Sequence, residues 1–342
     1  MDNEDFTPEA AACFREAAIA RYQEGDVGGA RNLCAEGALR CREADLALPE
    51  ARLLVLEARY AAILNEGEPA LECAARACSL ADQVGDDALR AAARQSIGLV
   101  LALLGASGPA ERALRGALAF YEANGSENEV LAARADLQFL LAISGSHAAA
   151  VLTGRQVVDG WRACGDLQRE VGAANNLGCS LIELGRIDEA YDVLRPYLGD
   201  ARLPRYIKAR VSDTLIDVLL ARGDADEAEF MIRRATDPFE SHRSEYSEVA
   251  ELFHRARVAR LRGQNATALE LLKRVVATPD AMREDWLRKA HELLIEMAIE
   301  AGDLALQARA YERLLEMAST RLERDRRLVD IVLSHAMPWV FA

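Results

Sequence analysis

Apolar residues recur at steps of three and four along most of the chain, and the runs are interrupted by glycine. In residues 175–198, NNLGCSLIELGRIDEAYDVLRPYL, two amphipathic segments meet at Gly185, and a small residue, Ala190, follows five positions later. Such steps place apolar side chains on one helix face, and glycine suits the left-handed residue that closes a helix. The pattern therefore predicts two helices joined by a tight turn.

The same unit recurs through the whole chain. The small residue after the turn returns every 40 residues, with one interval of 38, at Ala30, Ala70, Ala110, Ala150, Ala190, Ala228, Ala268 and Ala308. A second small position lies twelve residues earlier in five of the units, but Gln138, Ile216 and Glu296 depart from it. Two small positions let paired helices approach closely. Each hairpin would still expose an apolar face that only the next one covers, which predicts a helical solenoid.

These features resemble the tetratricopeptide repeat (TPR) family. The resemblance is carried by Asn176-Leu177-Gly178, by Gly185 with Ala190, and by weaker copies in residues 219–231 and 260–272, and it covers roughly residues 10–318. It implies an all-α fold, a right-handed α-solenoid of about seven to eight hairpins with a long C-terminal helix. A HEAT-type array has a similar period and is the alternative.

The repeat is longer than that of most TPR proteins. The family's unit is about 34 residues, so the 40 residues found here require longer helices or longer turns between the repeats. Within the family, long repeats resemble those of bacterial regulators that sense peptides or partner domains.

The chain divides into an array, a long helix and a tail. We assign residues 1–302 to the repeats. Residues 303–336 contain neither glycine nor proline, and their apolar residues at mixed three- and four-residue steps predict one long helix. This helix either caps the last repeat or acts as a signalling helix that dimerises or leads into an output domain. Residues 337–342 form a short tail.

Composition and charge narrow the range of partners. The net charge of −14 argues against nucleic acid and favours a basic partner. No stretch reaches the roughly 18 apolar residues that a membrane span requires, and no signal-peptide pattern is present. Seven cysteines without a CxxC pair are typical of a reducing compartment. We expect a cytoplasmic protein without membrane or nucleic-acid partners.

The sequence contains no catalytic or cofactor motif. There is no glycine-rich phosphate loop and no GxSxG nucleophile elbow. The segment beginning at His291 resembles the start of HExxH, but Ile295 stands where the second zinc ligand belongs. We therefore expect neither an enzyme, nor a metal site, nor a cofactor.

A binding surface is the remaining candidate for function. In the TPR family the first helix of each hairpin lines the concave side, and the matching rows lie fourteen and fifteen residues before each repeat alanine. These rows are polar from the third repeat to the seventh and then become apolar at Leu293 and Leu294. The resemblance implies partner-binding candidates on these rows, Asp136, Asn175, Asn176, Asp213 and His254, together with the charged Arg210, Asp217 and Arg257 on the same first helices.

Asn176 lies where the family often places an asparagine that binds a peptide's backbone or terminal carboxylate. An amide offers a donor and an acceptor together, as a peptide unit needs. The simpler interpretation is that Asn175 and Asn176 are exposed or bond a neighbouring helix. The aspartates among the candidates argue against a simple carboxylate clamp and favour a partner with basic residues.

Three hypotheses for the function follow. The first is a non-enzymatic module that binds a peptide or protein in its groove and serves as the sensory or docking part of a bacterial signalling system. The second is the regulatory region of a longer enzyme, such as a diguanylate cyclase or kinase, which predicts a homodimer through the C-terminal helix. The third is a structural scaffold that self-associates through residues 293–294 and 339–341.

Overall fold

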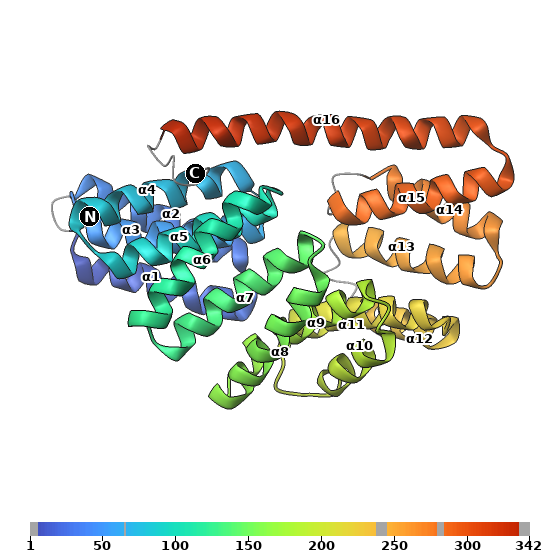
Figure 1. The fold of residues 1–342 in the computed structure, drawn as a ribbon, viewed down its shortest axis with the longest axis horizontal. Coiled ribbons are helices and arrows are strands. Elements are labelled where there is room, and N and C mark those ends of the chain that lie inside the picture. The colour runs from blue at the N-terminus through green and yellow to red at the C-terminus, as the bar shows by residue number, and fades with distance from the viewer. Residues whose placement is uncertain (1–5, 65, 237–244, 279–283, 335–342) are drawn as a thin grey trace. The chain divides into compact units, whose positions relative to one another are not determined.

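Paired helices account for nearly all of the structure, a computed structural model that describes residues 6–64, 66–236, 245–278 and 284–334. In this part of the chain sixteen α-helices follow one another without any strand (Figure 1). The odd-numbered helices are the first helices of the hairpins, and the even-numbered ones are the second helices. Their bounds are α1 (Pro8–Glu24), α2 (Val27–Glu43), α3 (Ala47–Ile63), α4 (Gly67–Val84), α5 (Asp87–Leu103), α6 (Ser107–Asn124), α7 (Glu127–Ile143), α8 (His147–Cys164), α9 (Leu167–Glu183), α10 (Ile187–Leu194), α11 (Arg205–Arg222), α12 (Ala225–Thr236), α13 (Glu245–Leu261), α14 (Asn265–Val276), α15 (Glu284–Ala301) and α16 (Leu304–Ser334).

Glycine closes the first helix of most hairpins, as the sequence predicts. The φ angles of these glycines lie between 70° and 93°, a region that a side chain would strain, at Gly25, Gly105, Gly145, Gly185, Gly223 and Gly263. Aspartates then begin several of the second helices. The Asp26 side chain accepts the backbone N–H of Gly29 at 2.8 Å, and that of Asp224 accepts the N–H of Glu227 at 3.1 Å.

The repeat alanines lie where paired helices meet. They are fully buried, with 0 % exposure, at Ala30, Ala70, Ala110, Ala150, Ala190, Ala228 and Ala268. Close approach is visible at Gly98 of α5, where an added Cβ would lie 2.6 Å from Cγ of Leu114 in α6. The small residues therefore allow paired helices to pack closely, as their spacing predicts.

The prediction that Ala308 continues this series is wrong. Ala308 is exposed, and Leu306 and Ala310 of α16 are buried instead. The reason is the spacing, because Gly302 lies six residues before Ala308, whereas the other turn glycines lie five residues before their alanine. One extra residue turns a helix by about 100°, so α16 presents a different face to its neighbours.

Longer helices, not longer turns, account for the 40-residue unit in the first four repeats. The helices α1–α8 contain 17 or 18 residues each. Consecutive helices from α4 to α9 are separated by only two or three residues.

The described residues form two compact units. The N-terminal unit contains residues 6–180, 202–206 and 324–334, and the C-terminal unit contains residues 181–201 and 207–323 within the described ranges. In the N-terminal unit one continuous core, rich in alanine, extends from Phe6 to Leu140. The division at residue 302 expected from the sequence stays a prediction, and the tail 337–342 lies outside the described residues.

Ion pairs link consecutive repeats of the N-terminal unit at one recurring pair of positions. Arg42 Nε donates to Glu50 Oε1 at 2.9 Å, and 120 residues later Arg162 Nε donates to Glu170 Oε1 at 2.9 Å. At the corresponding positions of the second junction the charges are reversed, with Asp82 paired to Arg90. Each pair joins the end of a second helix to the start of the next first helix.

The C-terminal unit has shorter second helices and smaller cores. α10 has 8 residues, and α12 and α14 have 12 each. Among its described residues, apolar clusters lie around Leu219 and around Leu272, whereas the N-terminal unit has the large core and a small cluster at Ala117 and Tyr121. The second helices of this unit therefore bury less apolar surface than α4, α6 or α8.

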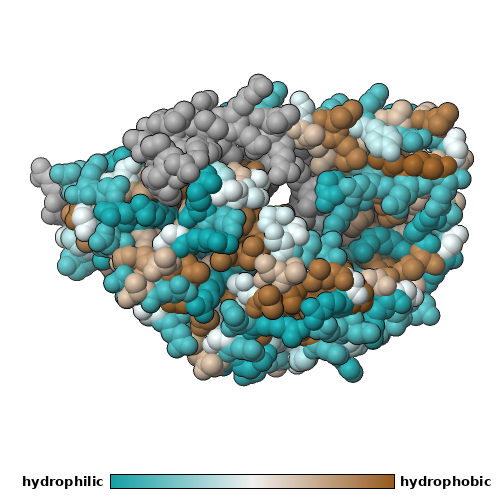
Figure 2. All heavy atoms as spheres, in the orientation of Figure 1, coloured by the Kyte–Doolittle hydropathy of each residue, from teal (hydrophilic) through white to brown (hydrophobic). Residues whose placement is uncertain are grey.

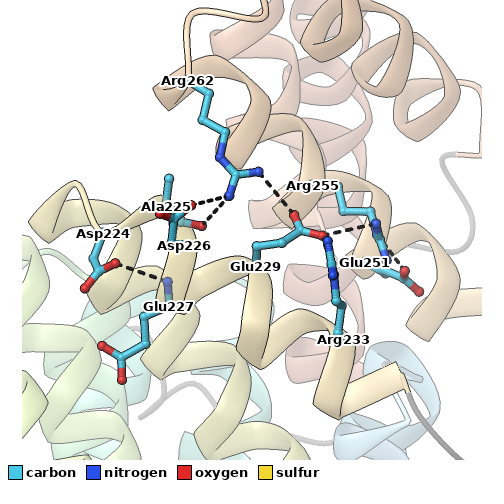
Figure 3. Close-up of polar contacts among 9 residues, drawn as sticks. All are labelled: Asp224, Ala225, Asp226, Glu227, Glu229, Arg233, Glu251, Arg255 and Arg262. Carbon is cyan, nitrogen blue, oxygen red and sulfur yellow. Dashed lines mark hydrogen bonds and ion pairs between the residues drawn. The ribbon is translucent and has the colours of Figure 1, made fainter.

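Charged side chains connect α12 to α13, as Figure 3 shows. Glu229 Oε1 accepts hydrogen bonds from Arg233 at 3.2 Å and from Arg255 at 3.5 Å, and Oε2 lies 3.9 Å from Arg262 Nη1. Arg255 also donates to Glu251 at 2.7 Å. A carboxylate that is only 13 % exposed thus holds three guanidinium groups at this junction.

α16 is the longest of the described helices, with 31 residues. Its first turns pack in the C-terminal unit through Leu306 and Ala310. Whether this helix caps the array or transmits a signal stays a hypothesis. Among the described residues no helix is long and apolar enough to cross a membrane.

Candidate partner-binding surface

A polar network connects three first helices of the N-terminal unit at Asp136. Asp136 Oδ2 in α7 accepts hydrogen bonds from Gln95 Nε2 of α5 at 2.6 Å and from Arg59 Nη1 of α3 at 3.2 Å. Asp136 is only 8 % exposed, whereas about a third of the Arg59 side chain is exposed. The Asp136 carboxylate raises the pKa of the Arg59 guanidinium, so the pair is held in its charged form.

The Arg59–Asp136 pair identifies the concave side of this unit. α3 and α7 belong to repeats that are separated by a whole hairpin, α5 with α6. Packed helices lie about 8–10 Å apart, so two helices on either side of a third are too far apart for a side-chain contact in a flat stack. They meet at 3.2 Å because the stack curves toward this face. The first helices therefore line the inside of the curve.

Gln138 of α7 lies two residues after Asp136. It stands at the position, twelve residues before the repeat alanine, where most of the repeats have a small residue. It is fully buried, its Nε2 donates to the backbone carbonyl of Ala173 in α9 at 3.1 Å, and its Oε1 has no hydrogen-bond partner. Gly154 in α8 makes the room, because a Cβ there would lie 2.5 Å from Nε2. The large side chain of Gln138 is thus accommodated by a glycine on the second helix of the same hairpin.

Asn175 and Asn176 occupy different environments on α9. Asn175 is 8 % exposed, and its Oδ1 is buried without a hydrogen-bond partner. Asn176 is partly exposed, and its backbone carbonyl accepts the hydroxyl of Ser180 at 3.1 Å. Asn175 is therefore neither exposed helix surface nor bonded through Oδ1 to a neighbouring helix, and a buried amide oxygen without a partner is uncommon in proteins.

The C-terminal unit brings four of the predicted residues together. His254 of α13 lies between two aspartates of α11, with Nε2 3.8 Å from Asp213 Oδ1 and Nδ1 4.0 Å from Asp217 Oδ1. Arg257, one turn further along α13, forms an ion pair with Asp217. His254 is 2 % exposed, and neither ring nitrogen has a hydrogen-bond partner. Burial acts to raise the pKa of Asp217, but Arg257, His254 and Lys289 hold it below its usual value.

Aromatic and basic side chains from the next repeats complete this cluster. The Trp286 ring of α15 packs edge-on against the His254 imidazole, with ring centroids 5.2 Å apart, and Phe253 lies 5.8 Å from the same indole. Lys289 of α15 contacts Glu183 of α9 at 3.4 Å. Because α9 and α15 are first helices three repeats apart, this contact marks the inner face of the C-terminal unit.

Two predicted features do not join these groups. Arg210 is exposed on α11 and has no ion-pair partner within the described residues. On the row that contains His254, Ser96 and Thr214 are buried and bond backbone carbonyls, Ser96 to Val55 of α3 and Thr214 to Arg210 of its own helix. This row therefore lies partly between the first helices, and the open groove surface is shared with residues one turn further on.

Exposed apolar side chains lie beside the polar network of the N-terminal unit. Ile63, Leu103 and Ile143 occupy equivalent positions in α3, α5 and α7, and they are 52 %, 41 % and 46 % exposed. Ile63 follows Arg59 by four residues, so both belong to the same helix face. Brown apolar areas are scattered among polar ones on the face that Figure 2 shows. The inner surface thus offers apolar contacts as well as hydrogen bonds.

Sequence reasoning missed several residues of these clusters. Arg59, Trp286 and Lys289 lie outside the two rows examined, and their partners come from other repeats. Gln95 stands on one of the rows, but its role becomes visible only beside Asp136. In the described residues no group of three or more His, Cys, Asp and Glu has the geometry of a metal site, and the two nitrogens of His254 face different carboxylates.

Comparison with known proteins identifies the fold. No known family profile matches the sequence, and no curated protein matches it. The structure is similar to the crystal structure of a Rap protein complexed with competence and sporulation factor, with a TM-score of 0.65 over 96 % of this chain and 99 % of that chain, at 17 % identity. The chain has a TPR-like repeat fold. A putative kinesin light chain from Podospora anserina with TPR-like repeats aligns over 58 % of this chain, at 20 % identity and a TM-score of 0.46.

The prediction of an all-α solenoid of TPR-like hairpins is therefore confirmed. The eight hairpins of the described residues agree with the seven to eight expected. The right-handed coiling of the whole array stays a prediction, as does the partner-binding role of the eight candidate residues.

Proposed function

We propose that this chain is a binding module for a peptide or protein segment, which lies along the inner face of the first helices. In the N-terminal unit a segment would contact the amides Gln95 and Asn175 and the Arg59–Asp136 pair, and the His254 cluster is a separate candidate contact of the C-terminal unit. Binding of this kind serves a sensory or docking step in signalling. The chemistry is recognition, and no step of the proposal requires catalysis.

The observation that carries this proposal is the buried Oδ1 of Asn175, which has no hydrogen-bond partner. A buried amide oxygen without a partner destabilises the folded protein by about 1–3 kcal/mol. A hydrogen bond from a ligand or an ordered water would offset this loss. A segment with exposed backbone N–H groups supplies suitable donors. The exposed row Ile63, Leu103 and Ile143 provides apolar contacts for the side chains of the same segment.

The structural similarity supports the proposal at the level of the fold. The Rap protein, similar over nearly its whole length, was solved as a complex with competence and sporulation factor. A solenoid of this architecture can therefore hold a bound factor. The residues named above are those of this chain, and the similarity does not assign their roles.

Selection from a library of random peptides displayed on phage tests the proposed function. The immobilised chain should enrich binding peptides, and the tightest peptide is then synthesised with a fluorescent label. Its affinity is measured by fluorescence polarisation for the wild type and for the double variant Asn175→Ala/Asn176→Ala. We expect the double variant to bind about tenfold more weakly, because it removes amide hydrogen bonds from the site.

A matched control removes an amide elsewhere. Asn124 is exposed at the end of α6 and bonds only the carbonyl of Phe120, so Asn124→Ala should leave the peptide affinity unchanged. Circular dichroism checks that each variant keeps its helix content. No enrichment of any peptide would overturn the proposed function, and equal affinity of the double variant and the wild type would overturn the site.

A further inference from the structure

We propose that Asp213 and Trp286 take up a cationic side chain, lysine or arginine, of a segment bound in the C-terminal unit. The inference rests on the proposed function and gives the C-terminal unit its own specificity. It concerns the cluster formed by α11, α13 and α15.

Asp213 differs from the other acidic side chains on the inner face. Asp136 is paired with Arg59, and Asp217 is paired with Arg257. Asp213 has no lysine or arginine within ion-pair distance in the described part of the chain, and a third of its side chain is exposed. Among the described residues, the basic side chain within 4 Å of Asp213 is His254. The carboxylate is therefore accessible and lacks a permanent counter-ion.

Trp286 adds a second contact for an incoming cation. Its ring and the Asp213 carboxylate both flank the same imidazole, at 5.2 Å between ring centroids and at 3.8 Å from Nε2. Trp286 is only partly buried. Because cations are attracted both to carboxylates and to indole faces, a lysine or arginine side chain suits this corner better than an apolar or acidic one.

The charged groups around this corner are of both signs. They are Asp213, Asp217 and exposed Arg210 on α11, Arg257 on α13, and Lys289 on α15. Arg257 and Lys289 act on Asp217, which leaves the Asp213 carboxylate for a cation of the bound segment.

The first experiment repeats the phage selection at pH 7.5 with the wild type and with Asp213→Asn. Asp192 is an exposed aspartate on the second helix α10, so Asp192→Asn removes the same charge away from the inner face. The wild type and Asp192→Asn should enrich peptides with lysine or arginine at one position, and Asp213→Asn should lose that preference while still enriching peptides.

The second experiment measures the affinity for one enriched peptide at pH 7.5. The peptide is acetylated and amidated and has lysine or arginine as its only ionisable side chain. Asp213→Asn should bind it about fivefold more weakly than the wild type, as for a partly exposed ion pair. Asp192→Asn should bind it with the wild-type affinity.

The outcomes separate the two proposals. If the wild type enriches no peptide, the proposed function fails and this inference fails with it. If peptides are enriched without a basic preference, or if Asp213→Asn keeps that preference, the binding function stands and the Asp213 assignment is overturned. Equal affinity of Asp213→Asn and the wild type for the enriched peptide also overturns the Asp213 assignment.

Discussion

The two units build the same repeat in different ways. In the N-terminal unit the second helices have 17 or 18 residues, and the repeat alanines of α2, α4 and α6 join one continuous core. In the C-terminal unit the second helices α10, α12 and α14 have 8 or 12 residues, apolar residues gather in smaller clusters, and Glu229 with its arginines connects α12 to α13. The same spacing of turn glycine and alanine thus forms the hairpin in both units. The length of the second helix decides whether apolar or charged groups connect neighbouring repeats.

This difference predicts how far the destabilising effect of one substitution extends within each unit. In an array each repeat contacts its neighbours, so the interface between repeats sets the cooperativity. A continuous apolar core couples several repeats, because each buried residue packs against more than one hairpin. A charged junction is solvated at its edge and couples its neighbours less strongly.

The largest expected effect comes from one matched pair of core substitutions. Leu114 and Leu272 stand four residues after their repeat alanines, and both are fully buried. Leu114→Ala and Leu272→Ala should each cost about 2–5 kcal/mol in unfolding free energy. Hydrogen-exchange mass spectrometry should show lost protection from α3 to α8 for Leu114→Ala, but only from α13 to α15 for Leu272→Ala. Equal spread in both variants would contradict the contrast between the units.

A smaller effect is expected at the charged junction. Glu229→Gln removes the charge that three arginines share, and we expect a loss of about 1–2 kcal/mol, because hydrogen bonds to charged groups contribute more than neutral ones. Urea denaturation followed by circular dichroism measures this change. Asp226 also pairs with Arg262 but is 93 % exposed, so Asp226→Asn should change stability by less than about 0.5 kcal/mol. Similar losses in the two variants would show that burial of Glu229 is unimportant.

The smallest effect concerns the ion pairs between N-terminal repeats. Asp82→Arg alone places two arginines together, and Arg90→Glu alone places two acids together; the double variant restores a pair with the polarity found at Arg42 and Glu50. A double-mutant cycle should give a coupling of about 0.2–1 kcal/mol, as for exposed pairs. Additive effects of the two changes would mean that this pair does not stabilise the junction.

The fold could be predicted in detail because its rules are local. Gly185 and Ala190 lie five residues apart, and that spacing alone predicts a turn and a close helix contact. The same rule failed at Ala308, where one additional residue rotates α16. The short α10 was not predicted, although Pro196 follows it closely and proline disrupts a continuing helix. The two units were not predicted, because their division depends on contacts between repeats.

The candidate site could be predicted only in part. The repeat rows indicated Asp136, Asn175 and His254, which the structure places on or beside the inner face. They could not indicate that Arg59 reaches Asp136, because these residues are 77 positions apart and belong to repeats that are not neighbours. Trp286 and Lys289 were missed for the same reason. Side chains from repeats that are not neighbours meet only because the stack of helices is curved. The spacing of residues within one repeat does not predict that curvature.

The reversed polarity at Asp82 and Arg90 bears on how such an array changes during evolution. Repeat genes grow and shrink by recombination, and a unit can be copied into a new place. A unit that ends like residue 42, with arginine, placed before a unit that begins like residue 90 would bring two positive charges together. Each junction is therefore stabilised only by a neighbouring repeat of opposite charge at this position. The charges thus favour one order of the repeats and also stabilise the contact between them.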